Sequence, residues 1–206
     1  MSTSITRLRR LATSARVRAA LSLGVVTAVG VTGTFANWTD SAAITGATFT
    51  SGTLDLQVQN GNAYATTTLG MAGMVPGNTS AEVLSVQNKG TVPLKYTLTG
   101  GLTGTDAATY GAAGALKLTI VLNGTKSGTG NAATCTGGTT IAGPVPLTAT
   151  TTTTIIGTRR PATPLASTTG SESLCFQVTF DLAAPTNLQG KTATATFTAT
   201  GTSDIS

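Results

Sequence analysis

The chain has 206 residues, which is enough for one or two domains, and its 12 Lys and Arg against 7 Asp and Glu give a net charge of +5. The excess comes from five arginines within residues 1–18, so the rest of the chain has no cationic surplus to bind nucleic-acid phosphates. Histidine is absent, which excludes Ser-His-Asp and Cys-His catalysis and any zinc site with imidazole ligands.

The first 36 residues have the three parts of a secretory signal peptide. Residues 1–18 are basic, residues 19–31 are apolar, and small residues precede Asn37. A transmembrane anchor is the alternative, but the apolar run would span roughly 20 Å as a helix, short of the ~30 Å hydrocarbon core. We therefore predict a signal peptide over residues 1–36, cleavage between Ala36 and Asn37, and a secreted or cell-surface protein with no membrane anchor after processing. An Arg-Arg pair in the basic part leaves Sec and twin-arginine export both open.

Alternating apolar and polar residues predict β-strands along the remaining residues, 37–206. The alternation is clearest in residues 54–59, 92–98, 116–122, 175–182 and 191–200. In the last of these segments, threonines that face outward alternate with four apolar residues that face inward: Ala193, Ala195, Phe197 and Ala199.

Three further segments are less regular. Residues 81–86 change phase between Val83 and Leu84, which a β-bulge would explain. Residues 106–115 fit a short helix or a loop, and the Thr- and Gly-rich residues 123–173 fit about two strands inside long loops. Together with the clear segments, they predict an all-β fold, a single β-sandwich of about eight strands.

Cys135 and Cys175 are the only cysteines. Because the export signal places the protein in an oxidising compartment, we expect them to form a disulfide, with two free thiols as the alternative. Closing a loop of about 40 residues would stabilise the fold by roughly 4 kcal/mol. Cys175 alternates with Phe176 and Phe180, so we expect the bridge on the outer face of the sandwich, as a surface staple.

Several motifs resemble the TasA/camelysin family of exported proteins, which a dedicated SipW-type signal peptidase processes. Residues 33–40 combine the small-residue cleavage site with the aromatic-x-Asp element Trp38-Thr-Asp40, and residues 47–56 contain the family's Phe-x-x-Gly-x-Leu-Asp-Leu strand. Residues 75–78 and 84–96 are similar to its Pro-Gly turn and Asn-x-Gly hairpin, and residues 188–197 to its closing strand. The resemblance covers residues 24–98 and 172–202.

The resemblance implies a jelly-roll-like sandwich over residues 37–206 that begins with an amino-terminal strand segment, residues 37–56. It also implies an extracellular structural role, since TasA-type proteins polymerise into matrix fibres. Camelysin-type members are classed as metallopeptidases, but this chain has neither histidine nor the His-Glu-x-x-His motif. We therefore expect no enzymatic activity, no catalytic residue, no metal and no cofactor, and we expect Glu172 and Asp181 to be solvated charges rather than a glycosidase pair.

The sequence thus predicts a secreted structural protein, a subunit of an extracellular or cell-surface fibre of the biofilm-matrix type. Its partners would be other copies of itself, signal peptidase, and components of the cell envelope or matrix. We expect the free amino-terminal segment to add as a strand to a neighbouring subunit, with five large apolar residues as its contacts: Trp38, Ile44, Phe49, Leu54 and Leu56. Docking of this segment on its own sandwich, a monomeric adhesion module and, less favoured, a camelysin-like peptidase are the alternatives.

Overall fold

The computed structural model describes residues 51–66 and 69–203, and these residues form an all-β sandwich. The predicted signal peptide and cleavage site lie outside the described residues, as do Trp38, Ile44 and Phe49.

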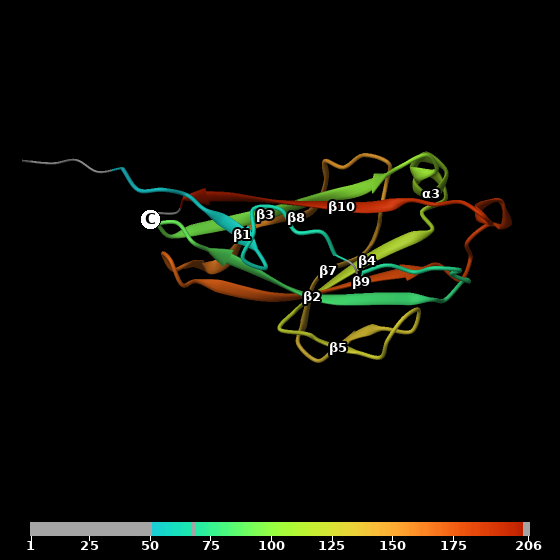
Figure 1. Ribbon diagram of the computed structural model, residues 1–206, viewed down its shortest axis with the longest axis horizontal. Helices are drawn as coiled ribbons and strands as arrows, with labels where there is room; N and C mark the ends of the chain where they lie inside the picture. The colour runs from blue at the N-terminus through green and yellow to red at the C-terminus, as the bar shows by residue number, and fades with distance from the viewer. Residues whose placement is uncertain (1–50, 67–68, 204–206) are drawn as a thin grey trace, which may run out of the picture. The chain divides into compact units, whose positions relative to one another are not determined.

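Two antiparallel sheets supply the eight strands of the sandwich, the number that the sequence predicts. The five-stranded sheet has the order β1 (Leu56–Val58), β2 (Thr79–Asn88), β9 (Ser171–Phe180), β4 (Leu116–Leu122) and β7 (Thr139–Pro146). The three-stranded sheet has the order β10 (Thr194–Ser203), β3 (Leu94–Thr103) and β8 (Thr153–Leu165). Figure 1 shows the two sheets face to face, with β10 and β3 in the upper layer and β2 and β9 in the lower one.

The core lies between the sheets and follows the period-two patterns of the strands. In β9 the even-numbered residues from Leu174 to Phe180 are buried and face the other sheet. They pack with buried residues of β3 and β4, such as Tyr96 and Leu118, in one hydrophobic cluster. Phe176 also reaches across to Phe197 of β10, with the two ring centroids 5.4 Å apart.

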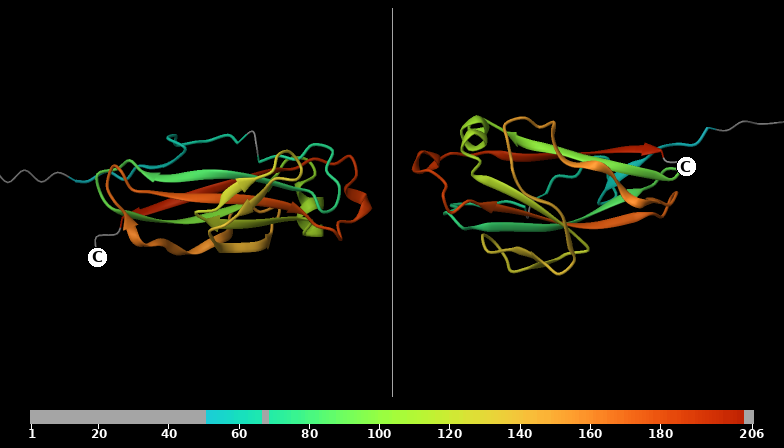
Figure 2. Two further views of the ribbon diagram at one scale, coloured as in Figure 1. Left: turned by 90° about the horizontal axis from the view of Figure 1, so that it is seen from below. Right: turned by 180° about the vertical axis from the view of Figure 1, so that it is seen from behind.

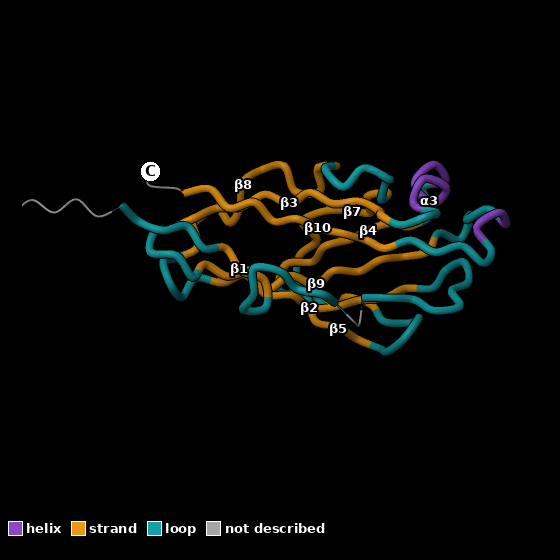
Figure 3. The backbone as a smooth tube through the Cα atoms, turned by 45° about the horizontal axis from the view of Figure 1, so that its top comes forward, coloured by secondary structure: helices purple, strands orange, loops and turns teal. Residues whose placement is uncertain are grey.

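The ambiguous residues 106–115 form a short helix, α3 (Ala107–Ala113), followed directly by β4. The helix ends at Gly114, whose φ of 56° is left-handed and favours glycine. Figure 3 shows α3 and the 3₁₀-helix η1 (Thr186–Leu188) at the same end of the sandwich. No helix among residues 51–66 and 69–203 is long and apolar enough to cross a membrane.

The phase change in β2 is not a bulge, because β2 pairs with β9 without any shift of register from Thr79 to Gln87. Leu84 faces the core, whereas Ala81 and Val83 face the opposite side of the sheet and belong to a second, smaller hydrophobic cluster. The strand is therefore covered on both faces at this point, and its apolar residues do not follow a single alternation.

The cover on the second face is a hairpin of β5 (Thr125–Ser127) and β6 (Thr134–Thr136), which we call the flap. Figure 2 shows it, in yellow, on the outer side of the five-stranded sheet. With β7 and β8, residues 123–173 thus contain four strands rather than about two. The alternation is weak in this region because β5 is fully exposed and β8 pairs with β3 through three register shifts.

Candidate functional site

An open apolar groove lies between the two sheets along one side of the sandwich. Its volume is about 510 Å³. One wall is β1 with the segment that follows it, and the other wall is the first half of β10. Its floor consists of four core residues: Leu84, Val86, Leu98 and Phe176.

The order of the strands explains why the groove is open. β1 and β10 each lie at one edge of their sheet, with β7 and β8 at the other edges, and in the described part of the chain β10 pairs only with β3. Ala195, Phe197 and Ala199 face inward as predicted and line the groove, and they are only partly buried because no strand among the described residues lies over them. Within the described residues, the other edge of β10 has no neighbouring strand for its backbone N–H and C=O groups, and such an edge is a template for strand addition.

The last residues of the predicted assembly segment, residues 37–56, belong to the protein's own sheet. Leu56 begins β1, pairs with Asn88 and lines the groove, so it belongs to the protein's own sheet and is not part of a free donor segment. The alternation in residues 54–59 therefore belongs to β1, a strand that pairs within the same chain. Leu54 precedes β1 and is 51% exposed. Thr53 is hydrogen-bonded to Thr91 through both its amide and its carbonyl, so a donor segment must end before Thr53.

A buried carboxylate holds the wall of the groove in place. Glu82 of β2 is 7% exposed; the Tyr64 hydroxyl donates a hydrogen bond of 2.8 Å to it, and the Thr66 hydroxyl donates another. The Leu69 amide in turn donates to Thr66 Oγ1 at 2.9 Å. The bond to Glu82 raises the pKa of Tyr64. Glu82 was not among the predicted site residues, although it has the same parity as Leu84 on the inward face of β2.

A second buried carboxylate joins the two sheets. Glu172 of β9 accepts two hydrogen bonds from Arg160 of β8, at 2.9 and 2.6 Å, and one from the hydroxyl of Tyr96 of β3. Burial raises the pKa of Tyr96 well above its usual range, and the bond to Glu172 adds to this. For Glu172, burial alone would raise the pKa, but the hydrogen bonds from Arg160 and Tyr96 outweigh it and the pKa is lowered.

The prediction that Glu172 is a solvated charge is therefore wrong. Glu172 is 8% exposed because it shares the inward parity of Leu174 and Phe176, a signal that the sequence already contained. Asp181, which follows β9, is more exposed and pairs with Lys117, whose hydrogen bond lowers the pKa of that carboxyl. The two carboxylates therefore pair with different cations.

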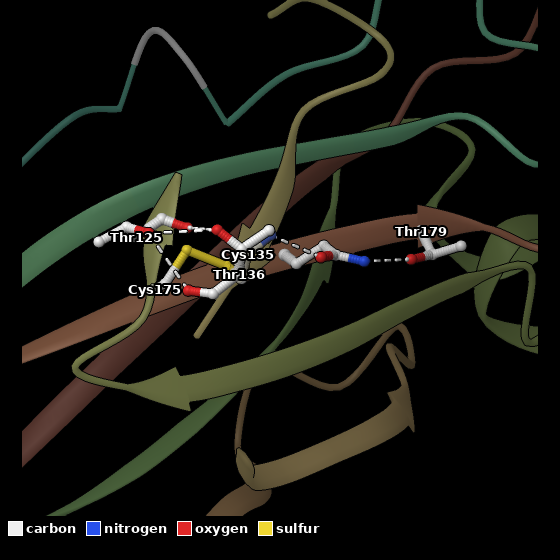
Figure 4. Close-up of a disulfide and its surroundings, with 6 residues drawn as sticks. Thr125, Cys135, Thr136, Cys175 and Thr179 are labelled. Carbon is white, nitrogen blue, oxygen red and sulfur yellow. Dashed lines mark hydrogen bonds between the residues drawn. A yellow bond between two sulfur atoms is a disulfide. The ribbon is translucent and has the colours of Figure 1, made fainter. Parts of the chain in front are cut away.

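Cys135 of β6 and Cys175 of β9 form a disulfide with an S–S distance of 2.01 Å. Figure 4 shows the bridge between Cys135 of the flap and Cys175 of β9. The Cys135 amide also donates a hydrogen bond of 2.8 Å to the side-chain oxygen of Gln177. Cys175 is completely buried together with Val121 and Ala133. The bridge is on the face of β9 opposite Phe176, but it lies inside a small core of its own and not at the surface as we expected.

The potential metal ligands are dispersed. Histidine is absent from the whole chain, and both cysteines are in the disulfide. Each described carboxylate has its own hydrogen-bonding partner: Gln57 for Asp55, Tyr64 for Glu82, Lys191 for Asp106, Arg160 for Glu172 and Lys117 for Asp181. Within residues 51–66 and 69–203, no group of three or more such side chains could hold a metal ion.

The family model of camelysin metallo-endopeptidase matches residues 8–120, which is more than half of the chain. The name of that family implies a metal ion, and the donor set described above does not fit one. No curated protein matches the chain. The match includes the residues that carry the sequence resemblance as far as Leu98, and the chain therefore belongs to the TasA/camelysin family.

Proposed function

We propose that the mature protein is an exported structural subunit that assembles by strand addition into an extracellular fibre of the biofilm-matrix type. The observation that carries the proposal is the open apolar groove beside the free edge of β10. The occupant would be residues 37–50 of another copy of the chain, the segment that signal-peptide cleavage would leave at the amino terminus.

The composition of this segment suits the groove. Trp38, Ile44 and Phe49 are separated by small or short polar residues, so an extended segment can place a few large side chains over the apolar floor. Burying each of them would contribute roughly 1.5–3 kcal/mol. The alanines of β10 are small and only partly buried, which leaves room for such side chains, and the backbone of the segment would pair with β10. A strand added to the next subunit makes a head-to-tail contact that does not close, which produces a fibre.

Deletion of residues 37–44 from the mature protein tests whether the segment drives assembly. We expect the intact protein to sediment as polymers at high concentration and the truncated protein to remain monomeric. If the intact protein never assembles, or the truncated protein assembles equally well, the proposal is wrong. A segment docked on its own sandwich would instead give a monomer that loses thermal stability on truncation.

A substitution inside the groove tests where the segment binds. Ala195→Trp would fill the space above Phe176 and should prevent assembly while the sandwich stays folded. Thr200→Trp is the matched control, because Thr200 is on the same strand and its side chain is exposed on the opposite face. Equal assembly of the two variants would refute the groove as the acceptor site.

A further inference from the structure

We infer that the two ends of the sandwich form the contact between successive copies of the chain. The end that carries Val75 and Leu182 in one copy would pack against the end that carries Leu54 in the next. This inference rests on the proposed strand addition and adds to it a second surface, formed by folded residues outside the groove.

The first surface is an apolar end held by two turns. Leu182 is 81% exposed and Val75 is 58% exposed. They lie at the same end because Val75 precedes β2 and Leu182 follows β9, and these strands pair in register there, Thr79 with Thr179. Leu182 lies over the turn at Gly77, whose amide donates a hydrogen bond of 2.8 Å to the Phe180 carbonyl. The backbone that carries these exposed side chains is thus held by the fold.

The second surface is at the opposite end. Leu54 precedes β1, which pairs with the last residues of β2, Leu56 with Asn88. The backbone on either side of Leu54 is held by hydrogen bonds from the Lys89 amide to the Asp55 carbonyl, at 2.8 Å, and from the Thr91 amide to the Thr53 carbonyl, at 2.9 Å. Leu54 therefore projects from an ordered end, and the proposed donor segment leaves the fold beside it.

The groove connects these two surfaces. A second cavity, of about 530 Å³, continues the groove toward the end that carries Val75. Met71 and Ala193 line this second cavity, and Leu69 and Thr194, which are close to them in the chain, line the groove. A donor segment that enters from this end runs antiparallel to β10, which starts there. The carboxyl-terminal residues of the donor segment then lie where the segment enters the acceptor, at the end that carries Val75. Leu54 of the donor copy, a few residues further along its chain, would therefore lie next to Val75 and Leu182 of the acceptor copy.

The test places a charge on either surface. Leu182→Asp and Leu54→Asp should each raise the concentration needed for sedimentable polymer by about tenfold or more, because each sets a carboxylate against an apolar partner. Thr158→Asp adds the same charge to an exposed position of β8 and should assemble like the intact protein. Circular dichroism and thermal unfolding establish that the variants are folded.

Mixing gives a readout that a folding defect would not produce. Leu54→Asp and Leu182→Asp each keep one intact end, so their equimolar mixture should form dimers at concentrations where either variant alone is monomeric. Normal assembly of both variants, with Ala195→Trp still blocked, would overturn the end contact and leave strand addition standing. Failure of the intact protein to assemble would overturn the proposed function itself.

Discussion

Removing Arg160 should destabilise the protein strongly, because it leaves the carboxylate of Glu172 buried without a cation. The side chains of this pair are only 17% and 8% exposed. Arg160→Met keeps most of the aliphatic stem and removes both hydrogen bonds to Glu172. Breaking a buried ion pair from one side costs about 3–5 kcal/mol. Since Arg160 is partly accessible to water, we expect about 3 kcal/mol, and for a domain of this size a fall in Tm of roughly 6–12 °C.

The assay is thermal and urea unfolding of a double-mutant cycle with Glu172→Gln. In the Glu172→Gln background no charge is stranded, so Arg160→Met should cost much less there than in the natural sequence. Lys117→Met is the matched control, since its partner Asp181 lies in a more exposed pair and Tm should change far less. A loss below about 1 kcal/mol for Arg160→Met, or equal losses in both backgrounds, would refute this account of the pair.

The stabilisation that the Arg160–Glu172 pair contributes should depend on pH. The pKa of Glu172 is lowered in the folded protein, so its pairing stabilises the fold above the ordinary carboxyl pKa of about 4.3 and this stabilisation is lost as the pH falls through the lower, folded value. Arg160→Met removes the main group that lowers that pKa. The difference in stability between the natural protein and the variant should therefore shrink as the pH falls from 7 to below 4. A constant difference would indicate a packing effect only.

Three further measurements follow from the structure and the sequence. Reduction, or replacement of Cys135 and Cys175 by alanine, should cost about 4 kcal/mol in the chain-entropy model, and equal stability of the oxidised and reduced proteins in urea would contradict this. Gly101→Ala should lower Tm because the added methyl carbon would clash with the Thr150 carbonyl oxygen, whereas the methyl carbon of Gly70→Ala would meet no atom of the described residues within 4 Å and should leave Tm unchanged. Amino-terminal sequencing of secreted material should begin at Asn37, or within one residue of it; a chain that still starts at Met1 would disprove the signal peptide.

The sequence predicts strands well where one face is buried and the other is wet. β4 matches the predicted segment 116–122, and β10 has outward threonines and inward alanines as expected. The strand at residues 81–86 is confirmed as part of β2, but the β-bulge is wrong, because Ala81 and Val83 are apolar on the outer face, where the flap covers them. Which faces of β2 are buried depends on packing against segments far apart in the chain, and local alternation does not contain that information.

The candidate site was predictable only in part. Ala195 and Phe197 were correctly placed on the inward face of their strand, but alternation says nothing about whether an opposing strand covers that face. The buried acids were predictable in principle, since Glu82 and Glu172 share the parity of core residues in β2 and β9. Their partners Tyr64, Tyr96 and Arg160 come from other strands and loops, and local periodicity gives no information about such pairings.

The flap has its own small core and its own covalent attachment, on the side of the five-stranded sheet away from the groove. Its tip, residues 128–130, is fully exposed and includes two glycines with positive φ. Lengthening such a turn costs little, about 0.6 kcal/mol for each doubling of the loop. A peptide epitope or an affinity tag inserted at Thr129 would therefore be displayed on the outer surface while the edge strands β1 and β10 keep their structure, which makes the flap the natural position for labelling the protein in an assembled state.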